Sequence, residues 1–170
     1  MADVAIVPAE PAHLATVAAI YAEAADTSYA TFDLAGKPLS FWEAALSPAI
    51  EGHMLLVALD GDGAVLGYAK SGRHKDRPAY DTTCEVSVYL ASDARGRGVG
   101  TALYDALLER LERSPLLLAV AGVALPNEAS VRLHVSRGFV EVGTFHDVGV
   151  KFGVKRDVQW FERSLAVDGQ

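Results

Sequence analysis

The 170-residue chain holds 15 lysine and arginine residues against 22 aspartate and glutamate residues, which gives a net charge of −7. An acidic balance of this size argues against DNA, RNA or an anionic membrane as the main partner, since binding to these depends on a basic surface. Cys84 is the only cysteine, so we expect no internal disulfide and no cysteine-based metal cluster, and no metal is implied. The length predicts one domain over residues 1–170.

The first 25 residues are rich in alanine but also carry acidic side chains, including Glu10 and Glu23. These charges are not typical of a signal peptide or a membrane span. We therefore expect a cytoplasmic protein with no membrane partner.

Two predicted helices follow a short strand at the start of the chain. Residues 4–7 are typical of a strand, and Pro11 begins a helix with an apolar stripe. After a polar and aromatic connector over residues 26–33, Ser40 is expected to cap a second helix that ends near Gly52.

The middle of the chain predicts a β-hairpin and a further strand. Asp-Gly turn chemistry at residues 60–63 lies between apolar runs at 54–59 and 64–69, which predicts the hairpin. Residues 80–90 alternate and are rich in β-branched side chains, as expected of a strand. Apolar residues at helical spacing then begin at Val99.

The C-terminal part predicts three more strands and a helix. The apolar run 116–123 suits a strand buried on both faces. Asn127 is expected to cap a helix that Gly138 ends, and residues 139–145 and 150–161 are expected to form the last two strands. The order of elements predicts one α/β domain with a mostly antiparallel sheet and a strand–helix–strand unit at its centre.

The segment Arg95-Gly96-Arg97-Gly98-Val99-Gly100-Thr101 joins the central strand to the central helix. Three glycines in five residues let the backbone approach a ligand closely and leave amide N–H groups free at the start of the helix. Together with the positive end of the helix dipole and two arginines, these donors predict a phosphate site. A glycine-rich turn without a ligand is the alternative.

The order β-α-α-β-β-β-α-β-α-β-β, with Arg95-x-x-Gly98-x-Gly100 after the fourth strand, resembles the GNAT family of acetyl-CoA-dependent N-acetyltransferases. Five further motifs resemble the phosphinothricin acetyltransferase branch. They are Arg77-Pro-Ala-Tyr80, Thr83-Cys-Glu85-Val-Ser87-Val-Tyr89, Leu125-Pro-Asn127-Glu-Ala-Ser130-Val-Arg-Leu-His134, Gly138-Phe139, and Gly149-Val-Lys151-Phe-Gly153 with Asp157-Val158. The resemblance runs from about Thr27 to Leu165. Lys155-Arg156 departs from it, because that branch usually has an aromatic residue there, near the acceptor end. The resemblance implies a twisted, mixed and mostly antiparallel seven-stranded sheet, flanked by about four helices and splayed between the fourth and fifth strands.

The resemblance also implies acetyl-CoA as co-substrate. The turn 96–101 would hold its pyrophosphate, and the pantetheine arm, which resembles a peptide, would pair with the exposed edge of the strand at residues 88–90. A backbone N–H near Val88 would donate to the oxyanion. Asn127 is assigned to the pantetheine or adenine end, although a helix cap explains it equally well. The implied cofactor-binding residues are Val88, Tyr89, Leu90, Arg95, Gly96, Arg97, Gly98, Val99, Gly100, Thr101, Asn127 and Ser130.

Two residues are implied in catalysis. Strand alternation places Glu85 on the face opposite Cys84. A strand glutamate alone is more often solvated or salt-bridged, but the resemblance implies that Glu85 is the general base that takes the proton of the acceptor amine, an effect typically worth about 10²–10⁴-fold. His134 shares a helix face with Asn127 and Ser130, and the resemblance implies that it protonates the departing thiolate or positions the base. A lone helix histidine is more often structural.

Arg73 and Arg77 precede the catalytic strand, and a guanidinium there would suit a carboxylate or phosphinate on the acceptor. Loop arginines are usually only solvated. Phe32 and Tyr80 complete the predicted substrate-binding set.

The function that the resemblance implies is direct acetyl transfer to the primary amine of a small amino-acid-like acceptor, such as phosphinothricin, methionine sulfoximine or methionine sulfone. Two alternatives stay open: another amine (a polyamine, an aminoglycoside or a protein N-terminus), and a non-catalytic acyl-CoA-binding sensor. A homodimer is also expected, with apolar surface offered by Trp160 and Phe161.

Overall fold

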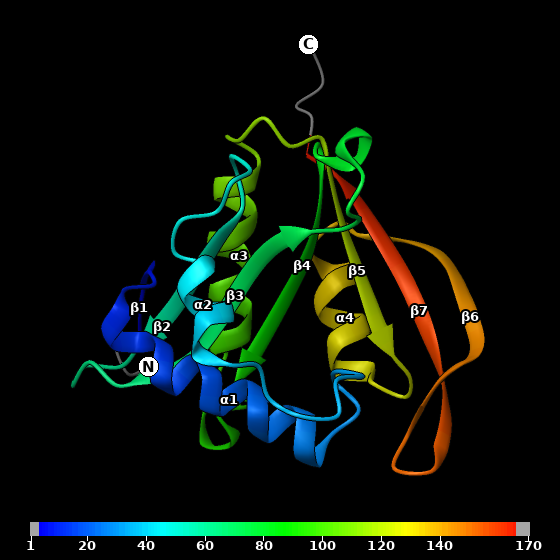
Figure 1. The fold of residues 1–170 in the computed structure, drawn as a ribbon, viewed down its shortest axis with the longest axis horizontal. Helices are drawn as coiled ribbons and strands as arrows, with labels where there is room; N and C mark the ends of the chain where they lie inside the picture. The colour runs from blue at the N-terminus through cyan, green and yellow to red at the C-terminus, as the bar shows by residue number, and fades with distance from the viewer. Residues whose placement is uncertain (1–3, 166–170) are drawn as a thin grey trace.

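The computed structural model describes residues 4–165. Seven strands form one sheet in the order β1-β2-β3-β4-β5-β7-β6 (Figure 1), and β4–β5 is the parallel pair among antiparallel neighbours. This confirms the predicted mixed, mostly antiparallel sheet. The strands are β1 Ala5–Pro8, β2 Met54–Leu59, β3 Val65–Arg73, β4 Thr83–Leu90, β5 Leu118–Ala124, β6 Val140–Lys151 and β7 Val154–Ser164. The α-helices are α1 Leu14–Thr27, α2 Leu39–Ala44, α3 Val99–Leu111 and α4 Glu128–Ser136, and 3-10 turns cover Pro11–His13, Pro78–Tyr80 and Ser92–Ala94.

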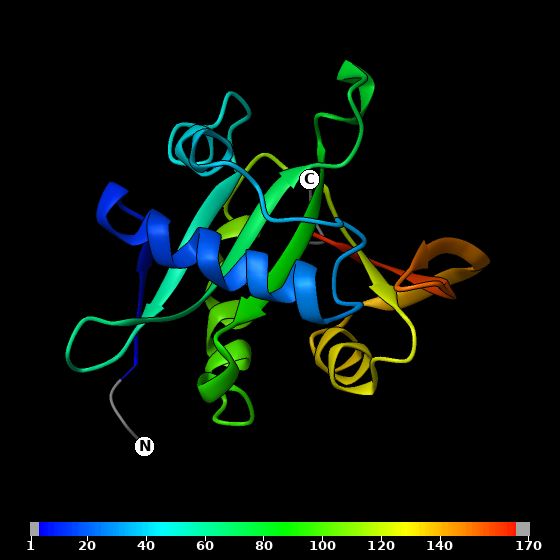
Figure 2. The ribbon, with the colours of Figure 1, turned by 60° about the horizontal axis from the view of Figure 1, so that its bottom comes forward.

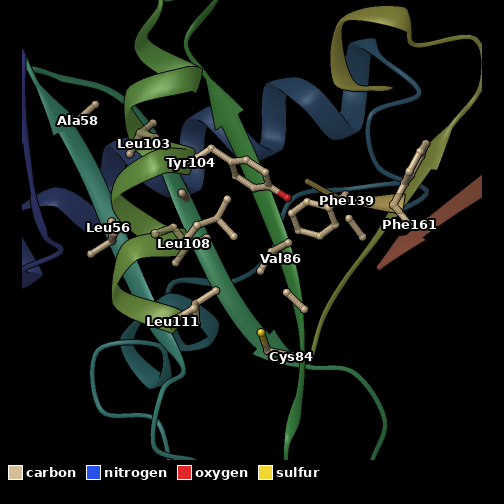
Figure 3. Packing of buried hydrophobic residues seen from close by; sticks show 14 of the residues in the cluster. Leu56, Ala58, Cys84, Val86, Leu103, Tyr104, Leu108, Leu111, Phe139 and Phe161 are labelled. Carbon is tan, nitrogen blue, oxygen red and sulfur yellow. The ribbon is translucent and has the colours of Figure 1, made fainter. Parts of the chain in front are cut away.

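The helices cover both faces of the sheet. Figure 2 shows α1 and α2 on one face and α3 and α4 on the other. On the first face, Val17 of α1 and Trp42 of α2 pack in one buried cluster with Tyr68 of β3. On the second face, the apolar side of α3 packs on β4, where Cys84 points into the core (Figure 3). Burial raises the pKa of the Cys84 thiol to about 12, so this thiol is a core group rather than a nucleophile.

The β4–β5 pair opens along its length. Register pairs run from Thr83–Leu118 to Glu85–Val120, and beyond them the two strands diverge toward their C-terminal ends (Figure 1). The predicted splay between the fourth and fifth strands is therefore confirmed. It leaves the second half of β4 without a paired strand on that side.

The second helix differs from the sequence-based expectation at both of its ends. The hairpin of β2 and β3 forms as predicted, but Ser40 does not cap α2, because the helix begins at Leu39 with Pro38 as its N-cap. The helix ends at Ala44 instead of near Gly52. Pro48 explains the early end, since proline disfavours helical backbone in the residue before it.

The boundary between the last two strands was also wrong. β6 continues to Lys151, so the turn lies at residues 152–153 and not at 146–149. The irregular residues form a bulge within β6, where Asp147 adopts a positive φ of 51°. The Asp157 carboxylate of β7 accepts the backbone N–H of Asp147 at 2.8 Å and contacts His146, which fixes the bulge without ending the strand.

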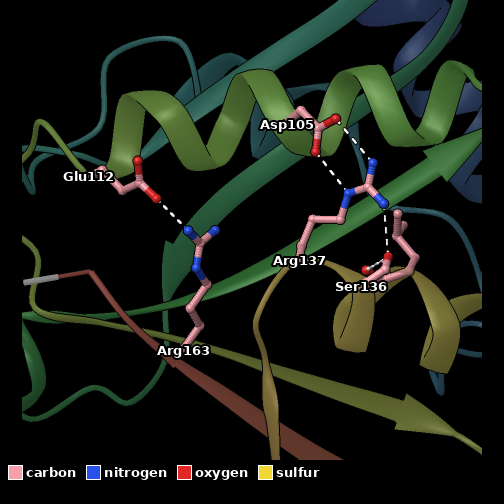
Figure 4. Close-up of polar contacts among 6 residues, drawn as sticks. Asp105, Glu112, Ser136, Arg137 and Arg163 are labelled. Carbon is pink, nitrogen blue, oxygen red and sulfur yellow. Dashed lines mark hydrogen bonds and ion pairs between the residues drawn. The ribbon is translucent and has the colours of Figure 1, made fainter.

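Ion pairs join α3 to the C-terminal part of the chain. Asp105 of α3 accepts two hydrogen bonds from the Arg137 guanidinium, at 2.8 and 3.1 Å, and Arg163 of β7 donates to Glu112 (Figure 4). Arg137 lies one residue after α4, so the bidentate pair fixes the end of α4 against α3. Within residues 4–165, none of the helices has the length and apolar run that a membrane crossing requires.

Candidate active site

A cavity of about 560 Å³ lies where β4 and β5 diverge. Its walls come from α1, the following loop, β4, β5 and α4. Seven of the residues predicted to bind the cofactor line it: Val88, Tyr89, Leu90, Arg95, Gly100, Asn127 and Ser130. We call it the cofactor cavity.

The backbone of β4 directs unpaired groups into this gap. Ala91 N donates to Leu66 O of β3 at 3.0 Å, and Leu117 N donates to Thr82 O on the β5 side at 2.8 Å. Because backbone groups alternate along a strand, the N–H and C=O of Val88 face away from β3, toward the open side. An extended amide-containing ligand could therefore add to β4 there as an extra strand.

The glycine-rich turn ends at the edge of the same cavity. Gly96 and Gly98 adopt φ values of 71° and 81°, which favour glycine, and Gly98 is the N-cap of α3. The first hydrogen bond of the helix runs from Ala102 N to Gly98 O at 3.0 Å. The N–H groups that precede Ala102 in the helix have no intrahelical acceptor and suit an anion. Of this turn, Arg95 and Gly100 line the cavity, whereas Gly96, Arg97, Gly98, Val99 and Thr101 do not.

His134 forms part of the cofactor cavity from α4. Its side chain is buried, and Nδ1 lies 2.7 Å from the carbonyl oxygen of Ser130. A carbonyl oxygen only accepts, so Nδ1 carries the proton and Nε2 is an acceptor in the neutral ring. Burial lowers the pKa of His134, which favours that neutral form. Asn127 caps α4 as its sequence suggests, accepting from Ser130 N at 3.2 Å.

A second cavity, of about 350 Å³, adjoins the first and has aromatic walls. Tyr21 of α1, Trp42 of α2 and Tyr68 of β3 contribute rings from three separate elements. We call it the acceptor cavity. Both cavities share the residues Tyr29, Ala30, Val86, Ser87, Tyr89, Gly122 and Ala124, so they are neighbouring compartments with a common wall.

Glu85 lines the acceptor cavity, next to residues that line both compartments. Its Oε2 lies 3.5 Å from Nδ1 of His74, which follows β3. The His74 ring is held between the rings of Tyr80 and Trp160, with centroid distances of 6.1 and 5.8 Å. The Glu85 carboxylate therefore lies beside the His74 ring, and 44% of its side chain remains exposed.

Residues 17–139 match the acetyltransferase (GNAT) family. The chain belongs to the GNAT family of acetyltransferases. Its relatives include the phosphinothricin N-acetyltransferase of Streptomyces coelicolor, which is 48% identical over 114 residues, or 66% of this chain and 67% of that protein. The L-methionine sulfoximine/L-methionine sulfone acetyltransferase of Pseudomonas aeruginosa is 39% identical over 117 residues, 69% of this chain and 68% of that protein.

A solved GNAT structure confirms the predicted fold. The phosphinothricin acetyltransferase of Sinorhizobium meliloti, crystallised in complex with acetyl-CoA, superposes with a TM-score of 0.89 at 30% identity. The match covers 96% of this chain and 89% of that one. The seven-stranded sheet with four α-helices is thus the GNAT architecture.

The predicted acceptor residues of this GNAT protein lie in two places. Phe32 lines the acceptor cavity, but Arg73, Arg77 and Tyr80 are not among its lining residues. Arg73 instead lies 3.4 Å from the Asp81 carboxylate, and Tyr80 contacts the His74 ring. Their role in binding an acceptor stays a prediction.

Sequence reasoning missed two polar residues of the acceptor region. Lys70 lines the cavity, and His74 contacts Glu85. A signal for Lys70 was present, because it is a charge that directly follows the uncharged segment from Val65 to Ala69. No local signal marked His74, which lies in a stretch of charged residues.

Proposed function

We propose that this chain transfers the acetyl group of acetyl-CoA to the primary amine of a small amino-acid-like acceptor, of the phosphinothricin, methionine sulfoximine or methionine sulfone type. The observation that carries the proposal is the position of the Glu85 carboxylate. It lies in an aromatic-walled acceptor cavity that adjoins the gap between β4 and β5. The relatives named above act on acceptors of this class.

The cofactor cavity fits acetyl-CoA on two grounds. Backbone N–H and C=O groups of β4 face the gap, as pairing with a pantetheine arm requires. The free N–H groups at the start of α3, with Arg95 beside them, suit a pyrophosphate. When bound, a thioester supplies an electrophilic carbonyl and a thiol leaving group.

Three residues of the chain then have separate roles in the reaction. Glu85 accepts a proton from the acceptor ammonium, directly or through one water, so that the amine nitrogen can attack the carbonyl carbon. As the carbon–sulfur bond breaks, the nitrogen loses a second proton and the thiolate gains one, so the products are the amide and the free thiol. The N–H of Val88 donates to the carbonyl oxygen that gains negative charge. Because His134 holds its proton on Nδ1 toward Ser130, its Nε2 is an acceptor, and this tautomer favours a positioning role over proton donation to sulfur.

Free-thiol release from acetyl-CoA, measured over a panel of amines, tests this function. The panel holds phosphinothricin, methionine sulfoximine, methionine sulfone, spermidine, an aminoglycoside and a short peptide. We expect turnover on the first three, and for the Glu85→Gln variant a kcat lower by about 10²–10⁴-fold with unchanged acetyl-CoA binding. Turnover on the cations alone would overturn the acceptor class, and undiminished turnover in Glu85→Gln would remove Glu85 as the base. The absence of thiol release with every amine, together with tight acetyl-CoA binding, would favour a non-catalytic acyl-CoA-binding sensor.

We also propose that the chain forms a homodimer through β6. Phe161 is buried and Trp160 lines the acceptor cavity, so the two residues expected to offer apolar surface do not provide it. The β6–β7 hairpin does, because β6 is an edge strand and the hairpin carries apolar side chains that are 43–63% exposed. They are Val140, Val142, Phe145, Val148, Val150, Phe152 and Val154. A patch of this kind is typical of an interface, and a second copy supplies a matching apolar face.

A further inference from the structure

We propose that Lys70 binds the anionic group of the acceptor, the α-carboxylate of an amino-acid-like substrate, while Glu85 faces its amine. The inference rests on the proposed function and adds the residue that selects the class of acceptor. Lys70 is a cation in the lining of the acceptor cavity, whereas Arg73 and Arg77 lie outside that lining.

Lys70 and Glu85 lie on one wall of the acceptor cavity. In the β3–β4 register, Lys70 pairs with Ser87 and Gly72 pairs with Glu85. The two charged residues are therefore diagonal neighbours on the same face of the sheet, with a backbone separation of about 7–8 Å. Both line the cavity. The wall thus presents one positive and one negative group side by side, which complements a zwitterionic α-amino acid.

No carboxylate of the described residues neutralises Lys70. Among residues 4–165, no Asp or Glu oxygen lies within 4.0 Å of its Nζ, although Lys37, Lys155 and Arg73 each have such a partner. Burial lowers the pKa of Lys70, and the charge of Glu85 partly opposes that effect. Its nearest aromatic contact is the Phe41 ring, whose centroid lies 5.3 Å from Nζ. Partial burial of an ammonium without a counter-ion has a cost in free energy, and a ligand anion would offset that cost.

Among the residues that the structure describes, Lys70 is also the sole cationic side chain in the lining of the acceptor cavity. Arg73 lies outside the lining and is paired with Asp81. An acceptor bound with its carboxylate at Lys70 and its amine at Glu85 would direct its side chain toward the remaining walls, which are mostly aromatic. That orientation suits a short, uncharged or weakly polar side chain and disfavours a polycation.

A matched pair of acceptors tests the inference: methionine sulfone and its α-carboxamide, which keeps the amine and side chain but lacks the anion. We expect Lys70→Met to lower kcat/KM for methionine sulfone by about 10- to 100-fold, mainly through a higher KM. The reason is that the loss of a hydrogen bond between charged groups weakens binding by about this factor. The kcat/KM for the carboxamide should change less than threefold. Lys70→Arg should restore part of the preference. Acetyl-CoA binding, measured by calorimetry, should be the same in both variants.

Lys37→Met is the matched control. Its ammonium also lies near the Phe41 ring, at 5.8 Å, but it is paired with Asp33 and does not line the cavity. We expect the selectivity of the Lys37→Met variant between the two acceptors to equal that of the wild type. Equal losses on both acceptors in Lys70→Met, or no loss on either, would overturn the assignment of Lys70 to the carboxylate. If the wild-type protein acetylates neither acceptor nor any amine of the panel, the proposed function fails and this inference fails with it.

Discussion

The position of one proton on His134 decides what this side chain is able to do. The Nδ1–H group donates to Ser130 O, and the ring is packed among Tyr104, Phe139 and Phe161. Both features stabilise a neutral imidazole, in agreement with its lowered pKa. His134 therefore packs α4 against the core and also forms part of the wall of the cofactor cavity.

This burial predicts a pH dependence of stability. The folded pKa of His134 lies below that of the unfolded chain, about 6.5, so below that pH the unfolded state binds a proton that the folded state does not. The free energy of unfolding should then fall as pH falls, by at most about 1.4 kcal/mol per pH unit, until the folded pKa is reached. His134→Phe keeps an aromatic ring and removes this contribution. Urea unfolding at pH 7.5 and 5.5 should show a smaller decline in the variant, and identical declines would contradict the interpretation.

At the scale of elements, the β6–β7 hairpin holds the loop that closes the acceptor cavity. Lys151 is fully buried, and its Nζ donates to Thr31 O at 2.8 Å. Phe32 packs directly over Gly149, where a Cβ would lie 2.4 Å from a ring carbon. The Arg156 guanidinium lies 3.9 Å from the centroid of the Tyr29 ring. The Gly149–Gly153 motif therefore shapes the acceptor cavity from outside it.

Gly149→Ala tests whether this contact between the hairpin and Phe32 shapes the acceptor cavity. The added methyl group would displace the Phe32 ring, so we expect the acceptor KM to rise by about threefold to tenfold, consistent with a repacking cost of about 1 kcal/mol, while acetyl-CoA binding is unchanged. Gly61→Ala is the control, because a Cβ there meets no atom within 4 Å. An unchanged acceptor KM in a folded Gly149→Ala protein would show that the contact between the hairpin and Phe32 does not shape the site.

At the scale of the whole molecule, the exposed apolar side chains of β6 predict association of two copies. Light scattering after size-exclusion chromatography should give twice the chain mass of 18.0 kDa. Val150→Glu places a charge in the patch and should shift the mass toward the monomer. Leu117→Glu, at an exposed leucine outside the patch, should not. A wild-type monomer at working concentration would refute the dimer.

The sequence by itself determined the order of the elements, the face of β4 on which Glu85 lies and the shape of the turn before α3. Each depends on local chemistry: alternation sets the face of Glu85 and Cys84, and positive φ values require glycines at 96 and 98. The end of α2 was missed although Pro48 is a local signal for it, whereas the bulge in β6 depends on the contact between Asp147 and Asp157 of another strand.

Only the tertiary structure decided which charges meet inside the acceptor cavity. Lys70 and Glu85 are 15 positions apart in the sequence, and the β3–β4 register makes them neighbours. His74 contacts Glu85 because the chain folds back after β3, and Arg73 is drawn to Asp81 instead of the cavity. Pairing between strands sets these distances, and no local sequence pattern encodes the pairing of side chains across a sheet.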